Sequence, residues 1–429
     1  TGNFPKAVET PQTTERSLVD VDSLKKQLEE VEAKAAEHLD GWQRAQAEFV
    51  NYKNRIVRGK RMIMIGSNNY LGLTTDPRVR EAAIEAIKRY GTSCTGSRFL
   101  NGNLAMHNEL EQELADFVGK EAGLVFSTGM SVNLGTISAI VSRHDTAVID
   151  KDDHASIYDG CKLSYGKVER FEHNNVASLR EALERASKVA NGNGGSLVVV
   201  DGVFSMEGDI APVPAYADIC AEWGMALMID DAHGVGVLGK TGRGTAEHFD
   251  LEDKADIIMG TFSKSLAAIG GFVVGDPDVI KYIQHKARAL IFTAAPPPAS
   301  IGAVLAALDI IDAEPERRQH LWDNTRFMMT SLRAIGFDCG DSETPVIPIV
   351  VGDDYLAFKM AKRLDEEGVF VNPVVSPACA PGRALIRTSY MATHRREHLT
   401  RALEAFQKVG RELGLVSSPE AGRGLRAGG

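Results

Sequence analysis

Short apolar runs alternate with amphipathic segments along residues 62 to 275. Two of the runs, residues 226–229 and 257–259, are uninterrupted and too short for helices, as is typical of strands buried on both faces. Segments in which apolar residues recur every three or four positions lie between the runs and predict helices. These predicted helices span 77–90, 105–118, 131–143, 176–190 and 212–223. The alternation predicts an α/β fold with a mostly parallel central sheet and flanking helices.

The pattern changes after the proline cluster at residues 296–298. A long apolar segment predicts a helix over 299–313, and a smaller α+β unit follows it. The predicted strands of that unit lie at 346–350, 369–371 and 384–388, and its predicted helices at 354–367 and 395–413. We therefore predict a large domain over 59–298, a small C-terminal domain with its linking helix over 299–415, and a disordered tail over 416–429.

The N-terminal segment has a different pattern. Between residues 21 and 56, apolar side chains recur at alternating spacings of three and four, which indicates a long heptad-patterned helix. We predict this helix over 21–58, after a polar segment, 1–20, that we expect to be disordered. Its acidic and basic residues are balanced in number, as on a solvated helix with ion pairs. A dimerisation or packing helix is the simplest interpretation, and docking of a carrier protein or partner is the alternative.

The composition excludes several classes of protein. The chain has 429 residues, of which 44% are hydrophobic and 25% charged, and its net charge of −10 argues against a nucleic-acid surface. The five cysteines are scattered without metal-ligand spacing, so we expect no metal site. No apolar run approaches the roughly 18–20 residues of a transmembrane segment, and no signal-peptide pattern is present. We expect a cytoplasmic protein; peripheral contact with a membrane through a local basic face stays open.

Candidate chemistry lies where predicted strands end. The run 226–229 leads to Asp230 and His233, and the run 257–259 leads to Lys264. Ligands of open α/β sheets bind outside the carboxyl ends of the strands, so one crevice can receive all three side chains. A lysine, a carboxylate and an imidazole are what an enzyme needs to hold pyridoxal 5′-phosphate (PLP) and tune its ring. Taken alone, a lysine after a strand is more often a solvated loop residue.

Other strand ends converge on the same crevice. The run ending at residue 126 leads to Ser127, Thr128 and Gly129, which suit phosphate binding at a helix N-terminus or simply cap a helix. His154 could stack on a flat cofactor ring, although a capping or core role is commoner for a lone histidine. Ser205 follows a further strand and is brought near the same crevice.

Two further polar groups point to a substrate. Residues 67–72, with Asn68, form a polar loop that could reach a small ligand. Arg387 lies in the predicted late strand, where a guanidinium needs a carboxylate partner. The sequence leaves open whether the protein or a substrate supplies that carboxylate.

Together these segments resemble the α-oxoamine synthase family of fold-type-I PLP enzymes. The resemblance covers roughly residues 57–415 and rests on six ordered motifs, which lie at 67–72, 153–160, 201–208, 230–233, 260–265 and 386–388. It implies a fold-type-I architecture, PLP as the cofactor, and a homodimer with shared active sites. Separately, residues 40–53 of the N-terminal segment are similar to the long helix of GrpE-type nucleotide-exchange factors, over fourteen residues only.

The resemblance implies a role for each matching residue. Lys264 matches the Schiff-base lysine, Asp230 the partner of the pyridine nitrogen, and His233 the contact to the ring oxygen. These three and the stacking residue His154 are the implied catalytic group. The other implied cofactor contacts are Gly129, Met130, Ser205, Thr261, Ser263 and, from the neighbouring subunit, Thr293. Asn68, Arg387 and His154 match ligands of the substrate carboxylate.

Within the family, residues 91–102 and 369–377 are most similar to bacterial serine palmitoyltransferases. This implies decarboxylative condensation of an amino acid, with L-serine favoured, and a long-chain acyl thioester carried on coenzyme A or acyl carrier protein. Val375 replaces an arginine that some of these enzymes use on the substrate carboxylate, which places more weight on Arg387. Glycine C-acetyltransferase or another α-oxoamine synthase is the alternative. An aminotransferase or lyase would keep Lys264 and Asp230 without needing a thioester, and a non-catalytic subunit would typically lack the lysine.

Overall fold

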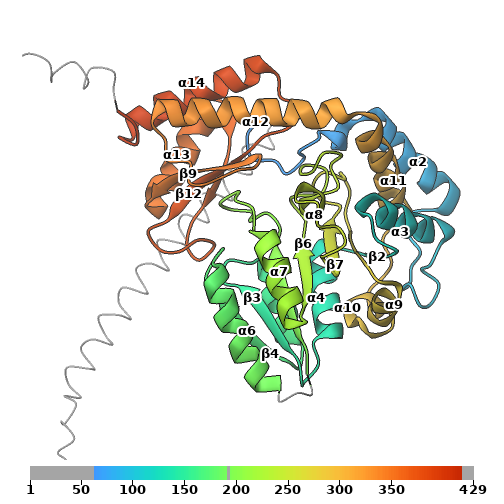
Figure 1. Cartoon of the computed structure of the whole chain (residues 1–429). Coiled ribbons are helices and arrows are strands. Elements are labelled where there is room, and N and C mark those ends of the chain that lie inside the picture. The colour runs from blue at the N-terminus through green and yellow to red at the C-terminus, as the bar shows by residue number, and fades with distance from the viewer. Residues whose placement is uncertain (1–61, 191–193, 418–429) are drawn as a thin grey trace, which may run out of the picture. The chain divides into compact units, whose positions relative to one another are not determined.

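A seven-stranded mixed sheet forms the centre of this computed structural model, which describes residues 62–190 and 194–417 (Figure 1). Its strand order is β2-β8-β7-β6-β5-β3-β4. The strands are β2 (Ala122–Phe126), β3 (Thr146–Asp150), β4 (Lys167–Phe171), β5 (Ser196–Asp201), β6 (Ala226–Asp230), β7 (Ile257–Thr261) and β8 (Gly271–Gly275). All neighbouring pairs from β4 to β7 are parallel, whereas β8 is antiparallel to both β2 and β7. The predicted α/β fold with a mostly parallel sheet is confirmed.

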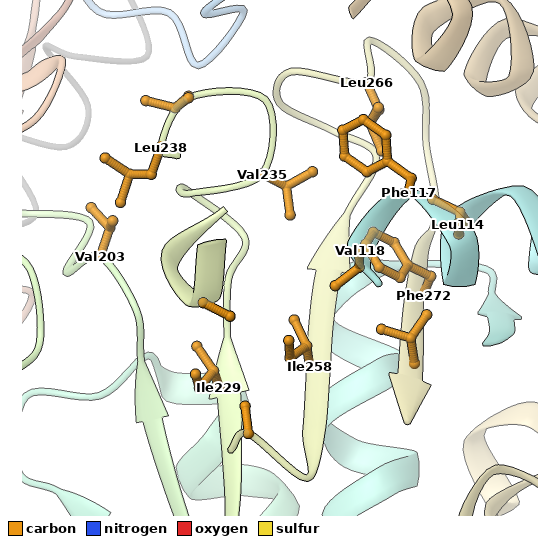
Figure 2. Packing of buried hydrophobic residues seen from close by; sticks show 14 of the residues in the cluster. Leu114, Phe117, Val118, Val203, Ile229, Val235, Leu238, Ile258, Leu266 and Phe272 are labelled. Carbon is orange, nitrogen blue, oxygen red and sulfur yellow. The ribbon is translucent and has the colours of Figure 1, made fainter. Parts of the chain in front are cut away.

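Both faces of this sheet are covered, which explains the uninterrupted apolar runs. Along β6, Leu227 and Ile229 face one buried cluster, and Met228 between them faces another. The period of two in a strand sends neighbours to opposite faces, so every residue of the run must be apolar. Figure 2 shows Ile229, Ile258 and Phe272 on adjacent strands of one face, with side chains of α3 near Phe272.

The helices around this sheet largely follow the predicted bounds. They are α2 (Pro77–Tyr90), α3 (Ala105–Val118), α4 (Gly129–Ile140), α5 (Ala155–Leu163), α6 (Val176–Ala190), α7 (Val213–Trp223), α8 (Thr245–His248), α9 (Pro277–Lys286), α10 (Arg288–Ile291) and α11 (Pro298–Ala313), with a 3₁₀ turn η1 (Leu73–Thr75). Helix α2 begins where predicted because Asp76 caps it, accepting from the backbone N–H of Arg78, and Pro77 follows as the first helical residue. Helix α4 begins two residues before the predicted start, since Thr128 is its cap.

The C-terminal part has its own sheet and core (Figure 1). Its strands are β9 (Val346–Gly352), β10 (Val369–Phe370), β11 (Asn372–Val374) and β12 (Ala384–Ser389); its helices are α12 (Pro315–Ile335), α13 (Asp354–Glu366) and α14 (Arg396–Glu412). The order β11-β12-β9 is antiparallel, and β1 (Ile63–Met64) pairs with β10 in parallel. Val416 is buried in this core. The packed part of the chain therefore includes the first residue of the predicted tail.

Several predictions about organisation are not decided by this fold. The segments 1–20 and 21–58, and the tail beyond residue 417, lie outside the described residues. The boundary between large and small domains at 298/299 stays a prediction, because residues 62–190 and 194–417 belong to a single unit of contacts. Among the helices of those residues, none combines the length and the apolar character needed to span a bilayer.

Candidate active site

A cavity of about 330 Å³ opens where the carboxyl ends of β3, β5, β6 and β7 meet the first turn of α4. Its size is in the range of small-molecule sites. The lining residues are Thr128, Gly129, Met130, Asn133, His154, Ser156, Asp201, Ser205, Asp230, Ala232, His233, Met259, Thr261, Ser263, Lys264, Ile269 and Gly270. Nine of the twelve residues to which the resemblance assigns a role are in this set. A wider, open hollow over α14 is lined by charged side chains and a threonine, without strand-end chemistry.

Lys264 reaches this cavity from the turn that follows β7. The turn is closed by a 3.1 Å hydrogen bond from the N–H of Ala267 to the carbonyl of Lys264, and Ala267 has a φ of 57°. A non-glycine residue in this left-handed region is strained, and such strain is often found at functional sites. Burial lowers the pKa of Lys264 to about 8, although the carboxylates of Asp230 and Asp201 oppose the shift. The amine is thus much more available as a neutral nucleophile or base than an exposed lysine.

Asp230 ends β6 with its side chain almost fully buried. The Nδ2 of Asn133 donates to its Oδ2 at 2.7 Å, and the backbone N–H of Ala232 donates to its Oδ1 at 3.1 Å. A carboxylate oriented by two such donors can in turn bind the protonated nitrogen of an aromatic ring.

His233 lies three residues further along and is held by a buried tyrosine. The hydroxyl of Tyr70 is 2.6 Å from its Nδ1. Burial lowers the pKa of His233 well below its usual range, and the positive charges of Lys264 and Arg387 add to this effect. A neutral imidazole bound at Nδ1 by a hydroxyl donor presents Nε2–H as a hydrogen-bond donor.

His154 and the residues around it form the opposite part of the lining. His154 is the N-cap of α5, because its Nδ1 accepts the backbone N–H of Ser156 at 3.2 Å. The Ser156 hydroxyl is 2.7 Å from the same nitrogen. The backbone N–H of His154 donates to Asp201, and burial together with the Asp230 charge raises the pKa of Asp201 well above its usual range.

The first turn of α4 provides a cradle for an anion. Thr128 caps the helix, and Gly129 approaches β7 so closely that an added Cβ would lie 2.7 Å from Oγ1 of Thr261. The Thr261 and Ser263 hydroxyls are 3.0 Å apart at the same end of the cavity. Backbone N–H groups at a helix N-terminus with neighbouring hydroxyls suit a phosphate dianion. Met130 lines the same turn with a half-exposed side chain.

Three predicted residues lie outside the lining. Arg387 is buried on β12, and its Nε donates to the carbonyl of Ser205 at 2.5 Å. No ion pair joins Arg387 to a carboxylate in residues 62–190 and 194–417. Asn68 has a buried Oδ1 that lacks a hydrogen-bond partner in the same residues. Thr293 is exposed in the segment after α10. The structure does not test the roles that the resemblance implies for them.

The arrangement defines a fold-type-I enzyme, and comparison with known proteins agrees. The family model "Aminotransferase class I and II" matches residues 60–406. A serine palmitoyltransferase of Sphingobacterium spiritivorum is 49% identical over 362 residues, which are 84% of this chain and 90% of that enzyme. An 8-amino-7-oxononanoate synthase of Symbiobacterium thermophilum is 42% identical over 84% of this chain and 91% of that enzyme. The chain belongs to the aminotransferase class I and II family, and the predicted resemblance to α-oxoamine synthases is confirmed.

Solved structures show the same relationship. A serine palmitoyltransferase from S. paucimobilis, solved with PLP and myriocin bound, superimposes with a TM-score of 0.81 at 37% identity, over 84% of this chain and 90% of that one. An 8-amino-7-oxononanoate synthase of Francisella tularensis superimposes with a TM-score of 0.70 at 27% identity, over 82% of this chain and 98% of that one. The predicted fold-type-I architecture is confirmed.

PLP is the cofactor that this site and this fold accommodate. The helix start at Gly129 suits its phosphate, Asp230 its ring nitrogen, His233 its ring oxygen and Lys264 its aldehyde carbon. Sequence reasoning missed Asn133 and the role of Tyr70, which hold Asp230 and His233. Neither had a recognisable signal, because an amide within an apolar helix and a tyrosine in a loop acquire these contacts only in the fold.

Proposed function

We propose that this protein is a PLP-dependent acyltransferase of the serine palmitoyltransferase type. It condenses L-serine with a long-chain acyl thioester and releases carbon dioxide and the free thiol, giving a 3-oxo sphingoid base. The observation that carries the proposal is the grouping of a partly buried Lys264 with the buried Asp230 and His233 around one cavity. The 46–49% identity to four serine palmitoyltransferases supports the choice of reaction.

The chain's own groups divide the work. When bound, PLP supplies an electron sink for negative charge at the Cα of the amino acid. Asp230 would keep the ring nitrogen protonated, and His233 would donate Nε2–H to the ring oxygen. Lys264 removes the Cα proton, for which a pKa of about 8 is well matched to neutral pH.

The substrate carboxylate must be held so that the correct bond breaks. Arg387 supports this role, because its guanidinium is buried and no carboxylate among the described residues pairs with it. Asn68 and His154 are proposed as its companions. Binding of a substrate carboxylate would supply the missing negative charge beside Arg387.

We also propose a cytoplasmic homodimer with shared active sites. Large apolar side chains are exposed, including Leu100 at 82%, Phe292 at 72% and, in the lining of the cavity, Ile269 at 66%. The N–H of Ala295 bonds the carbonyl of Gly96, which joins the segments of the first two side chains. Exposed apolar groups of this kind are typical of surfaces that are covered in an assembly. In such a dimer, Thr293 of each subunit would reach the cofactor phosphate bound by the other subunit. This would explain why Thr293 is exposed in the single chain.

The test uses purified, PLP-loaded protein. Visible absorbance is titrated with L-serine, glycine, L-alanine and L-threonine, and thiol release is then followed with short and long acyl-coenzyme A. A saturable change with L-serine and thiol release with long chains only is the expected result. A response to glycine with short donors would instead favour a glycine C-acetyltransferase, and a chromophore without thiol release would favour a carrier-protein donor or another PLP reaction.

A further inference from the structure

A continuous hydrogen-bonded chain runs beneath the cavity from one functional residue to another. The Nδ2 of Asn133 donates to Oδ2 of Asp230 at 2.7 Å and to Oγ of Ser156 at 2.9 Å. That Ser156 oxygen is 2.7 Å from Nδ1 of His154. Asn133 and Ser156 are 1% and 2% exposed, so solvent does not compete for these bonds.

The contact between two helices brings this chain together. Asn133 lies on α4 and Ser156 on α5. Where the helices meet, an added Cβ on Gly160 would lie only 2.8 Å from the carbonyl oxygen of Asn133. The absence of a side chain at Gly160 therefore permits the close approach that the Asn133–Ser156 bond requires.

The direction of the protons along this chain follows from its ends. An ionised Asp230 can only accept, so it faces the amide nitrogen of Asn133 rather than the amide oxygen. Both hydrogens of that nitrogen are then used, one on Asp230 and one on the hydroxyl of Ser156. The Ser156 hydroxyl accepts from Asn133, which leaves its own hydrogen to donate to Nδ1 of His154.

The backbone leads to the same conclusion independently. The N–H of Ser156 points at Nδ1 of His154 as the cap of α5. A proton on Nδ1 would oppose both this N–H and the hydroxyl, so the nitrogen must be an acceptor. The ring proton is then on Nε2, for which no hydrogen-bond partner lies among the residues that the structure describes.

We propose that Asn133 and Ser156 are positioning residues that hold His154 as its Nε2–H tautomer and fix the imidazole at the cavity. This rests on the proposed function, in which His154 contacts the substrate carboxylate. The Nε2–H tautomer offers that carboxylate a donor, whereas the other tautomer would offer a repelling lone pair. Asp230 thereby has two roles: it would bind the cofactor ring, and through Asn133 and Ser156 it orients His154 on the far side of the cavity.

The tautomer can be measured without any turnover. Holoenzyme labelled with ¹⁵N-histidine gives separate long-range ¹H–¹⁵N patterns for the two tautomers, and the His154 signals are identified by their loss in His154→Gln. The expected pattern shows an unprotonated Nδ1 and a protonated Nε2 for His154. A protonated Nδ1 in the wild-type holoenzyme would overturn the proposal.

Two variants then test the coupling. Ser156→Ala should lower kcat/KM for L-serine about tenfold, mainly through KM, as expected for one lost hydrogen bond. Its affinity for PLP should stay within about twofold of wild type, and its Nδ1 signal should shift toward a mixture of tautomers. Ser156→Thr keeps the hydroxyl and should restore most of the loss. An unchanged KM in Ser156→Ala, or an equal loss of PLP affinity, would contradict a positioning role.

A matched control is available on α4. The hydroxyl of Ser138 donates a hydrogen bond to the carbonyl of Leu134 within the helix, and Ser138 does not line the cavity. Ser138→Ala should therefore leave KM and the His154 spectrum unchanged. If wild-type protein shows the expected tautomer but no reaction with L-serine, the proposed function fails while the orientation of His154 stands. Should Ser156→Ala not fold, the wild-type spectrum still decides the tautomer.

Discussion

His173 is held between two carboxylates and makes folding stability depend on pH in a specific direction. Its Nδ1 is 3.2 Å from Oδ1 of Asp150, and its Nε2 is 2.9 Å from Oδ2 of Asp209. Burial disfavours the charged ring, but the hydrogen bonds to both carboxylates outweigh it and raise the pKa of His173 to about 10. The contact joins the end of β3 to the loop that carries Ser205, whose carbonyl binds Arg387.

The magnitude follows from linkage. A histidine pKa raised from 6.5 to about 10 stabilises the folded state fully below pH 6.5, and the contribution is lost as pH rises through 10. At about 1.4 kcal/mol per pH unit between these values, the upper limit is about 5 kcal/mol. The side chain is 21% exposed, which lowers this limit. We expect His173→Gln to reduce the free energy of unfolding by about 3 kcal/mol at pH 6.5 and by about 1 kcal/mol or less near pH 10.

The assay compares wild type and variant by denaturant unfolding at pH 6.5, 8 and 9.5, so that pH effects common to both proteins cancel. A suitable control is Arg180→Gln, which removes an exposed ion pair with Glu222. It should change the free energy of unfolding by at most about 1 kcal/mol. A destabilisation by His173→Gln that is independent of pH, or that grows with pH, would refute the reasoning.

Three further predictions follow from single sites. Arg387→Gln should raise KM for L-serine roughly 30-fold with an unchanged cofactor spectrum, because it removes a charged ligand of the carboxylate; a normal KM would assign Arg387 to structure alone. Gly129→Ala should weaken PLP binding at least about tenfold, measured by equilibrium dialysis, since the added Cβ meets a threonine at 2.7 Å; wild-type affinity would place the phosphate elsewhere. Arg98→Met should reduce the free energy of unfolding by about 3 kcal/mol in denaturant titrations, because Glu111 loses its buried partner at 2.7 Å; a change below about 1 kcal/mol would show that the pair is not needed.

The strands and their chemistry could be predicted because a buried parallel strand has a simple signature. An apolar run followed at once by Asp230, or within a few residues by Lys264, marks both the strand and the edge of the sheet where it ends. The edge strand β4 lacked this signature, since three of the five residues of Lys167–Phe171 are charged and most of the strand is solvent-exposed. Strand β8 gives a weaker signal, because only three apolar residues stand between its terminal glycines.

Other features depend on contacts that no local pattern reveals. Helix α12 (Pro315–Ile335) was not predicted, because its many charged residues obscure the period of its buried face. Arg318 on that helix is buried and donates to the carbonyls of Lys240 and Thr241, so a charged residue serves as part of the core. Likewise, the sequence could not decide between a protein and a substrate partner for Arg387. The fold adds that Arg387 is buried and donates to the carbonyl of Ser205, and a substrate carboxylate as its partner stays a proposal.

The most direct test of the proposed reaction follows the carbon atoms of serine. PLP-loaded protein is incubated with a long-chain acyl-coenzyme A and L-serine labelled with ¹³C at C1 or at C3, with Lys264→Ala as the control. The account predicts that the C1 label leaves as carbon dioxide in equal amount to the free thiol, that the C3 label remains in a 3-oxo amino alcohol, and that the variant forms neither. Retention of the C1 label in the product, conversion of serine without thiol release, or turnover by Lys264→Ala would contradict it.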